Sequence, residues 1–133
     1  MLKIRGIDHI VLRTQNLDKL LWFYSEVLGC QLERTLGDDV GLNQLRAGNA
    51  LIDIVTVDSE LGKLGGGPPG PTNHNLDHLC LQVEVSSVNE ILAHLAEYDI
   101  TPGEIDVRYG ATGFGQSVYV DDPDGNMVEL KPV

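Results

Sequence analysis

An internal repeat is the feature that most constrains how this chain folds. The segment Gly6-Ile7-Asp8-His9-Ile10-Val11-Leu12 is matched 69 residues later by Asn75-Leu76-Asp77-His78-Leu79-Cys80-Leu81. The two share an Asp-His pair and the same alternation of apolar and polar side chains. The segments 50–55 and 126–131 also match, each an alternating run around one central carboxylate. Two matches in the same order indicate a duplicated unit.

The first copy predicts the element order βαβββ. Alternation predicts a strand over 6–13, and apolar residues at helical spacing predict a helix over about 17–28. Asn16 is expected to cap this helix and Gly29 to end it. The remaining strands are expected near 30–35, 41–46 and 49–57.

The second copy predicts the same order. A strand near 77–84 precedes a helix that runs to about Tyr98, for which Ser87 and Glu90 have the spacing of a capping box. Further strands are expected near 103–108, 115–121 and 126–132. Asp122-Pro123-Asp124-Gly125 predicts a tight turn between the last two strands.

These elements predict an α+β fold, in which two βαβββ modules form a curved mixed sheet with helices on the outer face. A length of 133 residues fits one domain. Module one is expected at about 1–57, a connector at 58–75 and module two at 76–133. Gly65–Pro71 within the connector consists only of Gly and Pro, so it favours neither helix nor sheet.

Composition excludes several function classes. Lys and Arg number 9 against 20 Asp and Glu, a net charge of −11 that repels phosphate backbones and anionic membranes. Apolar runs are too short for a transmembrane span or a signal peptide, so we expect a soluble, cytoplasmic protein. Cys30 and Cys80 form no CxxC motif, and we expect both to be reduced and buried.

Strand alternation places four polar side chains on one face. Apolar residues flank each of them and would face the helices, which turns His9, His78, Asp53 and Glu129 to the opposite side. Imidazole and carboxylate are ligands for a divalent metal ion such as Zn, Ni, Mn, Fe or Co. Each histidine alone could be an ordinary strand residue, and Asp53 could be a solvated carboxylate. Their repetition favours a metal site.

The chain resembles the vicinal oxygen chelate superfamily, which includes glyoxalase I, extradiol dioxygenases and bleomycin resistance proteins. The resemblance is carried by Asp8–Leu12, Phe23–Gly29, Leu76–Leu79 and the run from Asp122 to Glu129. It implies His9, His78 and Glu129 as metal ligands, with Asp53 where many members have Glu. It also implies a homodimer.

The same resemblance implies candidate substrate contacts. Arg13 matches an arginine that contacts glutathione in bacterial glyoxalase I, although Val57 stands where those enzymes carry an asparagine. Arg108 and Tyr119 lie in the second module, where a cation and a phenol could bind an anionic substrate group. We therefore expect Arg13, Arg108 and Tyr119 to contact a small-molecule substrate.

The leading functional hypothesis is a glyoxalase-like, metal-dependent lyase or isomerase. It would act on a small molecule with vicinal oxygens through a metal-stabilised enediolate, and Glu129 or Asp53 would move the proton. One alternative is an Fe(II) extradiol-type dioxygenase that uses His9, His78 and Glu129 as a facial triad. The other is a metal-free drug-binding resistance protein with an acidic cleft for a cation.

Overall fold

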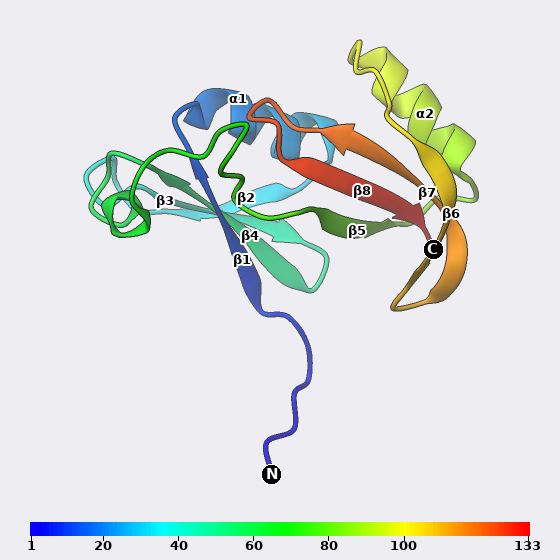
Figure 1. The fold of residues 1–133 in the computed structure, drawn as a ribbon, viewed down its shortest axis with the longest axis horizontal. Coiled ribbons are helices and arrows are strands. Elements are labelled where there is room, and N and C mark those ends of the chain that lie inside the picture. Colours follow the sequence, from blue (N-terminus) through cyan, green and yellow to red (C-terminus); the bar gives the residue numbers. More distant parts are fainter. The chain divides into compact units, whose positions relative to one another are not determined.

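The computed structural model describes residues 1–133, which divide into two compact units, Met1–Asn75 and Leu76–Val133. Each unit has the element order βαβββ (Figure 1), so the α+β fold predicted from the repeat is confirmed. Residues 1–8 precede the first strand without regular secondary structure. None of the helices combines the length and apolar character needed to cross a lipid bilayer.

Unit 1 contains a four-stranded mixed sheet in the order β1-β4-β3-β2. β1 (His9–Thr14) is parallel to β4 (Ala50–Thr56). β3 (Leu42–Ala47) is antiparallel to both β4 and β2 (Gln31–Thr35). The helix α1 (Leu17–Trp22) packs against β4. The core of this unit is made by fully buried apolar residues that include Leu12, Leu20, Leu45, Ile52 and Ile54.

The helix predicted over 17–28 is α-helical only as far as Trp22. Phe23–Val27 forms a π-helical turn, in which the Leu28 N–H donates to the Phe23 carbonyl at 3.0 Å. Phe23, Tyr24 and Val27 are all buried, whereas Trp22 is 42% exposed. Since consecutive residues cannot share one face of an ordinary α-helix, we attribute the wider turn to the burial of both adjacent aromatic rings.

Unit 2 repeats this topology with the strand order β5-β8-β7-β6. β5 (Leu79–Val83) is parallel to β8 (Met127–Pro132). β7 (Gly113–Asp121) is antiparallel to β8 and to β6 (Ile105–Gly110). The helix α2 (Val88–Glu97) packs against β7 and β8. Its buried face, together with the sheet, contributes Val88, Ile91, Leu95, Val118, Val120, Val128 and Leu130 to the core.

The helix ends follow the predictions only in part. Gly29 has a φ of +75°, which suits a glycine that ends a helix. Asn16 is the N-cap of α1, but its side chain makes no capping hydrogen bond. Ser87 also caps α2 without one, and the Glu90 carboxylate accepts from the backbone N–H of Ser86 at 3.0 Å. The predicted capping box is therefore replaced by a contact one residue earlier.

The turn predicted between the last two strands is confirmed. The Asp122 carboxylate accepts from the backbone N–H groups of Asp124 and Asn126, each at 2.9 Å. The Gly125 N–H donates to the Asp122 carbonyl, and Gly125 has a φ of +81°. A side chain that holds two backbone donors fixes the turn and hence the start of β8.

Both cysteines are free thiols, as expected, but only Cys30 is buried. The prediction that Cys80 is buried is wrong. Cys80 alternates with Leu79 and Leu81 along β5, and therefore lies on the face of the sheet that α2 does not cover.

Candidate functional site

The two units place their histidine and carboxylate in equivalent positions. Asp53 on β4 is paired with Val11 on β1, and Val11 follows His9 by two residues. Glu129 on β8 is paired with Cys80 on β5, and Cys80 follows His78 by two residues. Because side chains alternate along a strand, each histidine shares one face of its sheet with its carboxylate. Each unit therefore carries one His–carboxylate pair on the face opposite its helix.

In unit 1 the pair is His9 and Asp53. The Nδ1 atom of His9 lies 2.6 Å from an Asp8 carboxylate oxygen. This hydrogen bond raises the pKa of His9, and the charge of Asp53 raises it further. Asp53 is 4% exposed and accepts from the Gln44 amide at 3.2 Å and 3.3 Å. Both carboxylates therefore favour the protonated imidazole, the form that does not bind a metal ion.

In unit 2 the pair is His78 and Glu129, and the two side chains are in contact. The Nδ1 atom of His78 lies 2.5 Å from Asp77, and its Nε2 atom lies 3.4 Å from Oε2 of Glu129. Glu129 is only 6% exposed. Its other oxygen, Oε1, accepts a 2.5 Å hydrogen bond from the Ser117 hydroxyl. One carboxylate oxygen is thus held by β7 while the other faces the imidazole.

A further set of contacts fixes Ser117. Nη1 of Arg108 donates to the Ser117 hydroxyl at 2.9 Å and to the Ser117 carbonyl at 3.0 Å. The guanidinium carbon lies 4.2 Å from the centroid of the Tyr119 ring, and this ring meets the His78 ring edge-on at 5.6 Å. Because a guanidinium can only donate, the hydroxyl accepts from Arg108, and its single proton is left to donate to Glu129.

The imidazole and carboxylate groups of the two pairs are chemically suited to bind a divalent metal ion. A carboxylate that holds Nδ1 of a histidine leaves Nε2 to bind a metal and orients the ring, the arrangement common around protein zinc ions. Two ligand atoms bound at about 2 Å to one ion lie roughly 3 Å apart. The 3.4 Å between His78 and Glu129 is near this value. Within neither unit do three such side chains gather into a complete site.

Cys80 lies beside the unit 2 pair but is poorly suited to react. Partial burial raises the pKa of its thiol to about 11, and the charge of Glu129 contributes. The nucleophilic and metal-binding form of cysteine is the thiolate, so at neutral pH Cys80 is a small neutral side chain.

Arg13 has partners of its own within unit 1. Its guanidinium donates to the carbonyls of Gly62, Gly66 and Gly67 at distances between 2.6 Å and 3.3 Å. The side-chain amide of Asn75 pairs with the backbone N–H and carbonyl of Arg13 at 3.1 Å and 3.0 Å. These contacts fasten the connector to the edge strand β1. These contacts give Arg13 a structural role, and its contact with a substrate stays a prediction.

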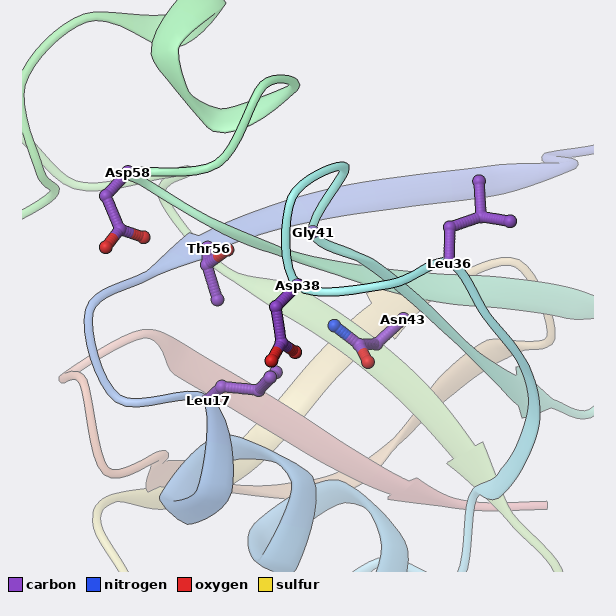
Figure 2. A pocket seen from close by; sticks show the side chains of 7 residues that line it. All are labelled: Leu17, Leu36, Asp38, Gly41, Asn43, Thr56 and Asp58. Carbon is purple, nitrogen blue, oxygen red and sulfur yellow. The ribbon is translucent and has the colours of Figure 1, made fainter.

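A hollow of unit 1 lies on the other face of its sheet (Figure 2). Asn43 lines the hollow and is paired with Ile54, a core residue on the helix side of the sheet. The next residue, Gln44, is paired with Asp53 and points to the opposite face. Leu17 of α1 and the carboxylates of Asp38 and Asp58 also line the hollow. The hollow is therefore separate from the His9–Asp53 pair.

Sequence reasoning missed two neutral residues that hold the carboxylates. Gln44 and Ser117 lie on strands that neighbour Asp53 and Glu129, and each donates to its carboxylate. The predicted hairpins could have suggested such neighbours, because antiparallel partners share a face. Their identity depends on strand register, which a bulge between Leu32 and Arg34 also alters in unit 1.

Comparison with known proteins identifies the family. Residues 6–130 match the family described as the Glyoxalase/Bleomycin resistance protein/Dioxygenase superfamily. A match over most of the chain shows that the protein belongs to this superfamily, as its resemblance predicted. Members of the superfamily often use divalent metal ions and include enzymes such as lactoylglutathione lyase.

Individual relatives have similar sequences or folds. Virulence protein STM3117 of Salmonella typhimurium is 29% identical over 96% of this chain and 83% of its own. Its crystal structure has a TM-score of 0.76, with 26% identity and 98% of each chain covered. Glyoxalase domain-containing protein RDO1 of Mycosarcoma maydis is 32% identical over 97% of this chain and 69% of its own.

A structure of lactoylglutathione lyase from Agrobacterium tumefaciens is also similar. It has a TM-score of 0.68 and 20% identity, and 96% of this chain and 92% of that one are covered. At this identity the likeness concerns the fold alone. The names of the relatives specify no common substrate, so the reaction has to be inferred from the residues of this chain.

Proposed function

We propose that this protein is a metal-dependent lyase or isomerase of the glyoxalase type, which acts on a small molecule with two vicinal oxygens. The observation that carries the proposal is the repeated His–carboxylate pair. In both units an aspartate holds Nδ1 of the histidine. In unit 2 the freed Nε2 lies 3.4 Å from Glu129. We propose His9, Asp53, His78 and Glu129 as ligands for divalent metal.

A divalent ion at these ligands supplies a Lewis acid that polarises the two substrate oxygens and acidifies the adjacent C–H bond. The protein's own part is to hold the ligands and move a proton. The carboxylates of Asp53 and Glu129 are 4% and 6% exposed, and neutral donors, Gln44 and Ser117, hydrogen-bond to them. Such preorganisation reduces the reorganisation that the reaction would otherwise require.

Glu129 is the better candidate for the base. Ser117 holds only Oε1, so Oε2 can take a proton from the substrate carbon and return it to a neighbouring atom. Both Asp53 oxygens face the Gln44 amide, which makes that carboxylate a more restrained partner. We therefore assign proton transfer to Glu129 and give Asp53 a ligand role only.

Metal analysis tests this proposal. Protein purified without chelator, then dialysed against excess Zn, Ni, Mn, Fe or Co and freed of unbound metal, is expected to retain at least one divalent ion per chain. No retained ion would contradict the proposal. Oxygen uptake by the Fe(II) form with a catechol would instead favour a dioxygenase.

We also propose that the protein forms a homodimer. Apolar side chains are exposed in both units: Leu2 and Ile4 at 96% and 90%, Tyr109 and Phe114 at 75% and 78%. Exposed apolar surface of this kind is typical of contacts between subunits. Light scattering on the eluting protein should give twice the chain mass of 14.5 kDa. A mass equal to one chain across a hundredfold range of concentration would contradict the dimer.

A further inference from the structure

Unit 2 holds two cations without a carboxylate partner, in a protein whose net charge is −11. Lys131 is 4% exposed and Arg108 is half-buried, and neither forms a salt bridge. Lys131 follows Glu129 by two residues on β8, and Arg108 donates to the Ser117 hydroxyl that binds Glu129, so both cations lie on the Glu129 face of the sheet. Glu129 is the one buried carboxylate of the same face. Buried cations without a counter-ion are costly, so this face favours an anion.

Lys131 is fixed beneath the hairpin that joins β6 and β7. Its ammonium donates to the carbonyls of Arg108 and Gly113. Two glycines leave room for it, since a Cβ at Gly110 or Gly115 would make a tight contact, 3.3 Å from Nζ or 3.2 Å from Cε. The lysine therefore supplies a fixed positive charge below the strand that carries Arg108.

Arg108 is held so that half of its guanidinium is left free. Nη1 is occupied by Ser117, and the plane stacks on Tyr119. Nε and Nη2, which form the other edge of the fork, have no acceptor within the protein. An arginine edge with two parallel N–H donors matches the two oxygens of a carboxylate. Stacking and the Ser117 bonds remove much of the side-chain freedom that binding would otherwise cost.

We propose that the Nε–Nη2 edge of Arg108 binds a carboxylate of the substrate. The substrate is then a small organic acid, with vicinal oxygens for the metal ion and a carboxylate group for Arg108. This inference rests on the proposed metal-dependent function and narrows its substrate class. It assigns Tyr119 to support the arginine and to line the site beside His78.

Two matched chelators separate the metal site from the carboxylate site. Acetohydroxamate carries vicinal oxygens alone, and succinate monohydroxamate adds a carboxylate. In calorimetric titrations of the Zn²⁺-loaded protein, succinate monohydroxamate should bind at least about tenfold more tightly than acetohydroxamate. This is the gain in affinity expected for charge-assisted hydrogen bonds. Arg108→Gln should abolish this preference, which is measured as the ratio of the two affinities within the same variant.

Two further variants control for charge and geometry. Arg46→Gln removes an exposed arginine that pairs with Glu33 in unit 1, and should keep the full preference. Arg108→Lys keeps the charge without the fork, and should lose most of the preference. Acetohydroxamate binding without any preference for the acid overturns this inference alone. If neither chelator binds the wild-type protein, the proposed metal-dependent function fails as well.

Discussion

His78→Ala is expected to lower the affinity for the divalent ion by more than about 100-fold. The loss of an outer carboxylate that merely orients a ligand costs roughly 10- to 100-fold, so loss of the ligand itself should cost more. The effect should be large here because His78 lies 3.4 Å from Glu129 and is oriented by Asp77. Metal content after purification and competition with a coloured chelator measure the change.

The matched control is His94→Ala. His94 lies on the exposed side of α2, where its ring is 5.3 Å from Tyr98, so its removal should leave metal binding unchanged. His78→Gln keeps most of the volume beside Tyr119 and guards against misfolding of the alanine variant. Equal metal affinity in His78→Gln and the wild-type protein would remove His78 from the ligand set.

Much of the fold could be predicted because its signals are local. Alternation and helical spacing located all eight strands and both helices, and the repeat gave their order. The π-helical turn at Phe23–Val27 escaped prediction, because it depends on the core that receives Phe23 and Tyr24. The Ser87 capping box failed for a related reason. Its residue pattern is compatible with more than one hydrogen-bond arrangement, and in the structure the Glu90 carboxylate accepts from the backbone N–H of Ser86.

The candidate site was predictable where its residues are charged and repeated. His9, Asp53, His78 and Glu129 follow from strand alternation, which places each pair on one face of its unit. The partners of Arg13 were not predictable. Its acceptors are carbonyls of a glycine-rich connector 49 to 54 residues away, and only the folded chain defines where they lie.

The connector is packed most tightly against neighbouring backbone at Gly62. A Cβ built there would lie 1.8 Å from the carbonyl oxygen of Thr56 and 2.7 Å from the Cα of Val57. The neighbouring backbone is itself fixed, because the Ser59 hydroxyl donates to Thr56 and accepts from the Gly62 N–H. The Gly62 carbonyl in turn receives two hydrogen bonds from Arg13. A side chain at this position therefore cannot be accommodated by a rotamer change alone.

Gly62→Ala is accordingly expected to lower the free energy of unfolding by about 3 kcal/mol, the upper part of the usual range for overpacking. The backbone after β4 must move, and Arg13 then loses the Gly62 carbonyl, one of its three acceptors. Gly67→Ala is the matched control in the same connector, because nothing lies within 4 Å of its added Cβ. It should leave stability unchanged or raise it by up to about 1 kcal/mol through a less flexible unfolded chain. Urea unfolding followed by circular dichroism gives both values, and equal midpoints for the two variants would refute the close packing at Gly62.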